Sequence, residues 1–288
     1  MPAATTDALP MVAFAYDFDG TLAPGNMQDH AFIPDELGMD RGAFWDEVGA
    51  LAKAQRGDHI LAYMNLMLLK AAQAGAPLAL ADWRARGADL PLFPGVETWF
   101  ERQNARAAAL GLDLAHFVIS SGNRELIEGS RIGAAFKRIY ASAFMFDAAG
   151  KASGIALAIN YTSKTQFLFR INKDTLDEWD NTAINKAMAH DERPVPFDRI
   201  VFFGDGATDV PTMRLMTDHG GYAVSVYDGA DAASAEAARE LKRDGRARFA
   251  APADYREGGP LDQLTGAILE EIAARVRAKA LTLWPDSA

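Results

Sequence analysis

The feature that most constrains the fold is an alternation of short apolar runs with amphipathic segments along the chain. The strand-like runs are residues 12–16, 115–120, 139–146, 199–204 and 221–227. Buried parallel strands typically read as continuous apolar runs, and strands that alternate with helices predict a sheet covered by helices on both faces. We therefore predict an α/β fold built on a parallel sheet, closed by an amphipathic C-terminal helix.

Two insertions interrupt this alternation. Between residues 28 and 90 the apolar residues follow helical periods, as they do at 60–75, and no run there resembles a strand. Residues 144–159 instead place an Asp-Ala-Ala-Gly turn between two strand-like runs, which predicts a small β-hairpin. We expect a core made of residues 1–27 and 91–288, with residues 28–90 forming a separate all-helical domain.

The charge balance and the lack of cysteine exclude several classes of function. The chain has 39 acidic and 29 basic residues, a net charge of −10, which disfavours nucleic acid and anionic membranes as partners. It contains no cysteine, so disulfides, thiolate metal sites and a cysteine nucleophile are excluded. The apolar run at residues 11–16 is too short for a signal peptide or a membrane span. We expect a cytoplasmic protein, and the sequence leaves its oligomeric state open.

Two carboxylates directly follow the first predicted strand. Asp17 and Asp19 stand in the segment Asp-Phe-Asp-Gly-Thr. Side chains two residues apart on an extended chain point to the same side, so both carboxylates should face one site. Gly20 allows a sharp turn, after which backbone N–H groups can point toward an anion. This strand end is therefore a candidate ligand site.

Two further predicted strands end on polar residues. The second run leads into Ser120-Ser121-Gly122 before a helix start, where a hydroxyl and unpaired amides suit a phosphate. The fourth leads into Gly-Asp-Gly-Ala-Thr-Asp, whose Asp205 and Asp209 suit a hard cation such as Mg²⁺. Each segment alone is common turn or helix-cap chemistry. Together they indicate a site, because ligands of open α/β sheets bind at the carboxyl ends of the strands.

These segments resemble the motifs of the haloacid dehalogenase-like hydrolase superfamily. Residues 17–21 are similar to its first motif, residues 117–120 to its second and residues 204–209 to its fourth. The helical segment lies where that family inserts its C1 cap, and the hairpin resembles an insertion of the phosphoserine-phosphatase-like branch. The resemblance implies a Rossmann-like core that carries a helical C1 cap.

The resemblance also implies roles for the four aspartates. Asp17 would be the nucleophile that forms an aspartyl-phosphate, and Asp19 would act as general acid and then general base. Mg²⁺ would be held by Asp17, by Asp19 through its main-chain carbonyl and by Asp205. Asp209 would support this metal site from the second layer of contacts.

Phosphate binding and a lysine complete the implied site. Ser120 would bind a phosphoryl oxygen, together with Ser121 and Gly122 of its turn and with Gly20 and Thr21 of the first turn.

The family places a lysine at the start of a helix before the fourth motif. Lys164 opens the segment that follows the hairpin, and we favour it for this role. Lys173 and Lys186 lie nearer to the fourth motif but late in their segments, so they remain alternatives. The lysine would balance the charge of the phosphoryl group and of Asp17.

The resemblance leads to an expected function with two rivals. We expect a Mg²⁺-dependent phosphomonoester hydrolase that acts on a small phosphorylated metabolite. One rival is a phosphotransferase, in which an alcohol takes the phosphoryl group. The other is a non-catalytic protein that binds metal or phosphate in a regulatory role.

Specificity is expected to come from the helical insertion. Trp45, Arg56, Tyr63 and Met64 are candidates to line the substrate site, although aromatic residues and methionine at helical spacing are more commonly core residues. Arg124 could approach the mouth of the site, although an arginine on a helix surface is commoner. The five histidines are scattered without metal-ligand spacing, so we interpret them as structural or surface residues.

Overall fold

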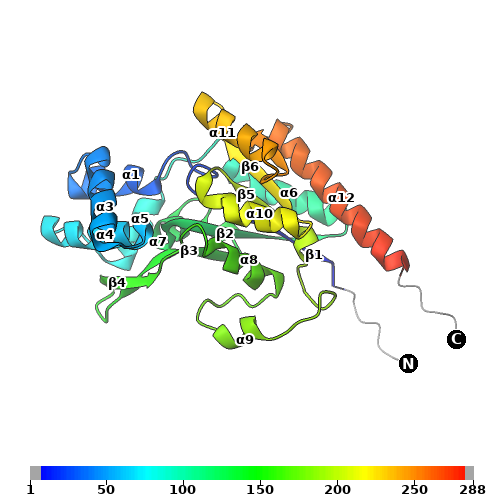
Figure 1. The fold of residues 1–288 in the computed structure, drawn as a ribbon, viewed down its shortest axis with the longest axis horizontal. Helices are drawn as coiled ribbons and strands as arrows, with labels where there is room; N and C mark the ends of the chain where they lie inside the picture. The colour runs from blue at the N-terminus through cyan, green and yellow to red at the C-terminus, as the bar shows by residue number, and fades with distance from the viewer. Residues whose placement is uncertain (1–7, 283–288) are drawn as a thin grey trace.

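The computed structural model describes residues 8–282, and a seven-stranded sheet forms its centre (Figure 1). The strand order is β4-β3-β2-β1-β5-β6-β7, and every neighbouring pair is parallel except β3 and β4. The strands are β1 (Met11–Tyr16), β2 (Asp113–Asn123), β3 (Arg138–Phe146), β4 (Ala152–Leu157), β5 (Ile200–Gly204), β6 (Tyr222–Tyr227) and β7 (Phe249–Pro252). This architecture confirms the predicted α/β fold class.

The helices follow the strands and the insertion. Those of the insertion are α1 (Met27–Ala31), α2 (Ile33–Leu37), α3 (Arg41–Gln55), α4 (His59–Ala74) and α5 (Leu80–Gly87). Those around the sheet are α6 (Val96–Ala109), α7 (Arg124–Gly129), α8 (Lys164–Asn172), α9 (Asn181–Asn185), α10 (Val210–Asp218), α11 (Ala232–Arg243) and α12 (Pro260–Thr282), with 3-10 turns at Gly133–Ala135, Phe197–Arg199 and Ala207–Asp209. Among residues 8–282, no helix is long and apolar enough to cross a membrane.

The apolar pattern of β1 explains why helices cover both faces of the sheet. Val12, Phe14 and Tyr16 belong to the core cluster that α6 and α12 share, whereas Ala13 and Ala15 belong to the cluster of α8 and α10. Successive side chains of a strand point to opposite faces, so a strand buried on both faces is apolar at every position. Because β1 is the middle strand of the sheet, the residues that follow its carboxyl end lie at the centre of that edge of the sheet.

The helical insertion lies at one end of the sheet, beside the β3–β4 hairpin (Figure 1). The tip of the hairpin reaches the insertion, because the Ala152 N–H donates to the Leu78 carbonyl at 2.8 Å and the Leu80 N–H donates to the Gly150 carbonyl at 3.1 Å. Residues 28–90 contain no regular strand in the structure. The hairpin therefore connects the insertion to the edge of the sheet.

Two elements near the C-terminus were not predicted from the sequence. Helix α11 is rich in alanine and charged residues, and strand β7 has only four residues. Both extend the sheet region beyond β6, since α11 packs against β6 and β7. They matter for function because the loop before α11 forms one wall of the cleft described below.

Candidate active site

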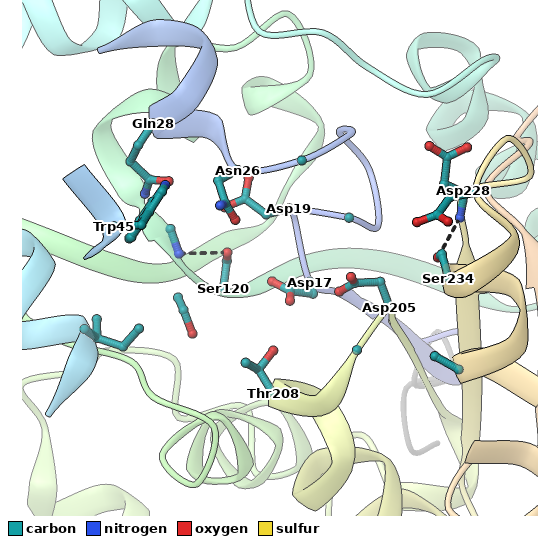
Figure 2. A pocket seen from close by; sticks show the side chains of 18 of the residues that line it. Asp17, Asp19, Asn26, Gln28, Trp45, Ser120, Asp205, Thr208, Asp228 and Ser234 are labelled. Atoms are coloured by element: carbon teal, nitrogen blue, oxygen red, sulfur yellow. Dashed lines mark hydrogen bonds between the residues drawn. The ribbon is translucent and has the colours of Figure 1, made fainter. Parts of the chain in front are cut away.

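The carboxyl ends of β1, β2 and β5 bring most of the predicted residues together. Asp17 follows β1 and Asp205 follows β5, the strand paired with β1 on one side, while Ser120 lies in β2 on the other side. Figure 2 shows the carboxylates of Asp17 and Asp205 side by side, with Ser120 and Asp19 close to them. These side chains line a cleft of about 860 Å³.

Asp17 is held firmly at the floor of this cleft. Only 5% of the residue is exposed, and its backbone N–H donates to the Phe203 carbonyl of β5 at 2.8 Å. Its Oδ1 accepts from the Phe18 N–H at 2.7 Å, and its Oδ2 accepts from Lys164 Nζ at 2.7 Å. Both carboxylate oxygens are thus oriented by donors, which keeps the side chain in one position.

Lys164 is the first residue of α8 and is fully buried. Its ammonium group also donates to Asp209 Oδ1 at 2.7 Å. Burial alone lowers the pKa of a lysine, but the adjacent carboxylates of Asp17 and Asp209 outweigh it and raise the pKa of Lys164. Lys173 instead donates to the carbonyls of Ile184 and Lys186, so the structure brings Lys164 to the site and neither alternative lysine.

Three acids surround this one cation. Carboxylate oxygens of Asp17, Asp205 and Asp209 lie within 4.8 Å of one another. Burial, followed by the charges of Asp209 and Asp17, raises the pKa of Asp205 to about 8. Burial also raises the pKa of Asp209 to about 6, even though Lys164 favours its ionised form. This group of hard oxygen donors fits a Mg²⁺ ion, which would supply the positive charge that one lysine cannot.

The loop after β5 is fixed by Asp209, which is fully buried. Its Oδ2 accepts from the Asp205 N–H at 3.1 Å, and an added Cβ on Gly204 would lie 2.4 Å from the same oxygen. Glycine at this position therefore allows the carboxylate to approach the loop backbone. Asp209 holds Lys164 and the Asp205 backbone at once, which orients both of them toward Asp17.

The turn after Asp19 requires glycine for two reasons. Gly20 has a φ of +71°, and an added Cβ would lie 2.2 Å from Asp205 Oδ2. The predicted phosphate contacts of this turn do not fit the geometry, because the N–H groups of Gly20 and Thr21 donate to the carbonyls of Ala23 and Phe18 within the turn. Thr21 is also fully buried and does not line the cleft.

Asp19 faces the helical insertion. Its Oδ1 accepts from the N–H of Met27, the first residue of α1, at 2.9 Å. Its burial, followed by the charge of Asp17, raises the pKa of Asp19 well above its ordinary value. Two carboxyl groups two residues apart therefore differ in environment, because Asp17 lies against a lysine and Asp19 does not.

The end of β2 supplies the polar groups of the next wall. Ser120 Oγ accepts from the Gly122 N–H at 3.1 Å, and the Ser121 carbonyl accepts from the Tyr63 hydroxyl at 2.7 Å. The Ser121 hydroxyl is buried and has no hydrogen-bond partner within the described residues. This wall therefore combines a serine turn with a tyrosine from α4 of the insertion.

The four candidates from the insertion separate into two pairs. Trp45 and Tyr63 line the cleft. Met64 is fully buried in the core, and Arg56 is an exposed residue that ends α3 with a φ of 51°. Arg124 also lies away from the cleft lining and forms ion pairs with glutamates, so it does not approach the site.

Sequence reasoning missed several residues that line the cleft. His59 had been interpreted as structural or surface, but its ring stacks on Trp45 at 6.2 Å between centroids. The far wall depends on α11, whose Asp231 N-cap was a sequence signal for a helix start. The other missed residues that bear polar side chains are Asn26, Gln28, Thr208, Asp228, Asp231 and Ser234.

Comparison with known proteins shows the family and the fold of this chain. A family model described as haloacid dehalogenase-like hydrolase matches residues 14–214. An uncharacterized protein of Borreliella burgdorferi is 29% identical over 92% of this chain and 98% of its own. A HAD family hydrolase from Salmonella enterica serovar Typhi has a similar fold, with a TM-score of 0.55 and 16% identity over 90% of this chain and 72% of the other. A substrate-bound phosphoserine phosphatase gives a TM-score of 0.51 and 14% identity over 83% and 92% of the two chains.

Proposed function

This chain belongs to the haloacid dehalogenase-like hydrolase family, and from that premise we propose that it is a Mg²⁺-dependent hydrolase of small phosphomonoesters. The observation that carries the proposal is the environment of Asp17. One oxygen of its carboxylate is tied to a buried, charged lysine, and the group lies at the floor of an 860 Å³ cleft. An ionised, oriented carboxylate at such a position is a competent nucleophile toward phosphorus.

The first step forms a bond between Asp17 and phosphorus. A carboxylate oxygen of Asp17 attacks the phosphoryl group while the bond from phosphorus to the ester oxygen breaks. Asp19, whose pKa is raised above its ordinary value, gives its proton to the leaving oxygen. The products of this step are a free alcohol and a phosphorylated Asp17.

The second step restores the enzyme. Asp19, now ionised, takes a proton from a water molecule, and the oxygen of that water attacks phosphorus. The bond between phosphorus and Asp17 breaks, which releases inorganic phosphate and leaves Asp17 as a carboxylate. Asp19 thereby acts as acid in one step and as base in the next, which its position beside Asp17 supports.

The remaining residues would bind the metal ion, balance charge and position the phosphoryl group. Asp17, Asp205 and the main-chain carbonyl of Asp19 would hold Mg²⁺, with Asp209 behind them, and the bound ion would offset the charge of the phosphoryl group. Lys164 balances charge on Asp17, and Ser120, Ser121 and Gly122 would bind phosphoryl oxygens. Gly20 shapes the turn, and its N–H donates to the Ala23 carbonyl within the turn.

We assign residues 28–90 as a cap domain and residues 1–27 with 91–288 as the catalytic core, of which residues 1–7 and 283–288 lie outside the described part of the chain. The support for this division is the contact of α1 and α4 with the end of β2: the Gln28 side chain donates to Asn123 Oδ1, and the Tyr63 hydroxyl donates to the Ser121 carbonyl. A cap that contacts the serine turn from two helices can exclude water from the first step and select the leaving group.

Hydrolysis of p-nitrophenyl phosphate tests this function. We expect turnover that requires added Mg²⁺ and that is lost in Asp17→Asn. Persistent turnover in that variant, or in a chelator, would contradict the mechanism. Product analysis with an added acceptor alcohol separates the two transfer chemistries, since a hydrolase releases inorganic phosphate and a phosphotransferase produces a new phosphoester.

A further inference from the structure

The lining of the cleft has an unusual distribution of charge. Five of its residues are aspartates, and no lysine or arginine lines it among residues 8–282. Two of the five, Asp228 and Asp231, belong to the loop before α11 and lie outside the proposed catalytic group. Figure 2 shows Asp228 on the wall opposite Trp45 and Gln28, with Asp17 between them. The cleft is therefore acidic at its floor and on the α11 side, and it lacks a compensating lysine or arginine on the opposite side within residues 8–282.

The lysine at the site, Lys164, is already paired with two carboxylates of the protein. Lys164 is fully buried and donates to both Asp17 and Asp209 at 2.7 Å. It lies beneath the cleft floor, so it can balance the phosphoryl group but cannot pair with the rest of a substrate. Within the described chain, any further negative charge on the substrate would find no lysine or arginine side chain in the lining.

The position of Asp19 indicates where the rest of the substrate lies. If Asp19 protonates the leaving oxygen, as proposed above, the leaving alcohol must sit beside it, on the side of the helical insertion. The residues there are the carboxamides of Asn26 and Gln28 and the aromatic side chains of Trp45 and Tyr63. These four side chains are all uncharged, so this wall offers hydrogen bonds and apolar contact but no counter-charge.

Two of these groups are also oriented by the protein itself. Gln28 Nε2 donates to Asn123 Oδ1 at 2.9 Å, and Trp45 Nε1 donates to Asp29 Oδ1 at 2.8 Å. The second contact adds another carboxylate directly behind the wall. His59, the remaining ionisable base of the lining, is exposed and stacks on Trp45. The wall next to the leaving group is thus neutral to acidic.

We propose that the substrate is a phosphomonoester whose leaving alcohol carries no negative charge, and that a neutral alcohol or an amino alcohol is preferred over a hydroxy acid or a second phosphate. An anionic group placed against this uncharged wall would lose its hydration without gaining a cationic partner, and the aspartates elsewhere in the cleft would repel it. This inference rests on the proposed function, because it uses Asp19 to place the leaving group.

Two matched pairs of substrates test the inference. O-phosphoserine differs from O-phosphoethanolamine by one added carboxylate. 3-Phosphoglycerate has a carboxylate where glycerol 3-phosphate has a hydroxymethyl group. We expect kcat/KM to be at least about tenfold higher for the member without the carboxylate in each pair, as expected for one uncompensated charge at short range. Equal values, or a preference for the carboxylates, would overturn the inference.

Turnover of a reference substrate, p-nitrophenyl phosphate, distinguishes failure of this inference from failure of the proposed hydrolase function. Turnover of p-nitrophenyl phosphate without any charge preference within the pairs contradicts the inference alone. No turnover of any of the five compounds in Mg²⁺ contradicts the hydrolase function, and the inference about its leaving group fails with it.

A charge inserted into the wall provides the complementary test. Asn26 is exposed at the cleft and its side chain donates to Asp29 Oδ2 at 3.3 Å, so Asn26→Lys should be accommodated. We expect it to reduce the preference for O-phosphoethanolamine over O-phosphoserine by several-fold. Asn181→Lys on the exposed helix α9 is the matched control and should leave the ratio unchanged. An unchanged ratio in Asn26→Lys would show that charge in this wall does not set specificity.

Discussion

The cleft and the junction of α6 with α12 each bury carboxylates beside basic side chains, but with opposite charge balance. At the cleft, three aspartates share one lysine. At the helix junction, Asp262 alone faces two arginines, accepting from Arg102 Nε at 3.1 Å and from Arg106 Nη2 at 3.0 Å. Gln103 Nε2 and the Gly258 N–H also donate to this one carboxylate.

The pKa values of the two groups move in opposite directions. Burial opposes ionisation of Asp262, but hydrogen bonds from Arg106, Gly258 and Arg102 lower its pKa to about 2. Burial and neighbouring acids instead raise the pKa of Asp205 to about 8. A buried acid with an excess of donors is satisfied by the protein alone, whereas acids with too few donors have capacity for a cation from outside. The comparison thus separates a carboxylate whose charge the protein itself balances from a group of carboxylates that can bind an external cation.

The largest expected effect comes from Asp17→Asn. Losing the nucleophile should lower kcat for p-nitrophenyl phosphate by at least about 10³-fold. The same change removes one of three mutually repelling acids, so the metal-free variant should unfold at an equal or higher temperature than the parent. Calorimetry in a chelator checks the second part, and a marked loss of stability would mean that Asp17 is structural.

The reverse pattern is expected for Asp262→Asn. Removing the charge leaves Arg102 and Arg106 partly buried without an anionic partner, which should lower the free energy of unfolding by about 2–3 kcal/mol. Denaturant titration measures this loss. Below the melting temperature kcat should stay within about twofold of the parent. A stable variant that has lost activity would contradict the assignment of this cluster as structural.

A pair of glycines sharpens the comparison further. Gly20 and Gly258 have φ values of +71° and +75°, but only Gly20 has a carboxylate where a Cβ would go. Gly20→Ala should reduce turnover about tenfold or more by displacing Asp205. Gly258→Ala should cost about 1 kcal/mol of stability through backbone strain and leave turnover intact. Similar turnover in the two variants would show that the position of Asp205 is not critical.

The smallest expected effect is a difference in pH dependence. The folded-state pKa of Asp205 is raised from 3.8 to about 8, so its contribution to stability is present below pH 3.8 and is lost as the pH rises toward 8. The depressed pKa of Asp262 acts oppositely, so its contribution is present above pH 3.8 and is lost as the pH falls to about 2. In a chelator, Asp205→Asn should therefore flatten the decline in stability between pH 5 and about pH 8. An unchanged decline would exclude Asp205 as its source.

The sequence predicts the central site better than its walls for a physical reason. Asp17, Asp19 and Asp205 follow apolar strands directly, and parallel strands bring their ends together whatever the rest of the chain does. Lys164 was favoured because it opens a helix after the hairpin, and the structure brings it to Asp17.

Contacts that depend on tertiary packing or on local turn geometry were not predictable. The amides of Gly20 and Thr21 are used inside their own turn, which the residue types do not reveal. The α11 wall was missed because its alanine-rich sequence lacks large apolar residues, and β7 is too short for a strand pattern. The pairing of Asp262 with Arg102 joins residues 160 positions apart.

Chemical trapping of the phosphorylated enzyme tests the central claim most directly. Borohydride reduces an acyl phosphate to an alcohol, so quenching the enzyme during turnover of p-nitrophenyl phosphate should convert Asp17 to homoserine, detected by mass spectrometry of the peptide that contains it. We predict this conversion in the parent enzyme with Mg²⁺ and its absence without substrate. Sustained turnover with Asp17 unmodified, or conversion of a different aspartate, would contradict an aspartyl-phosphate formed on Asp17.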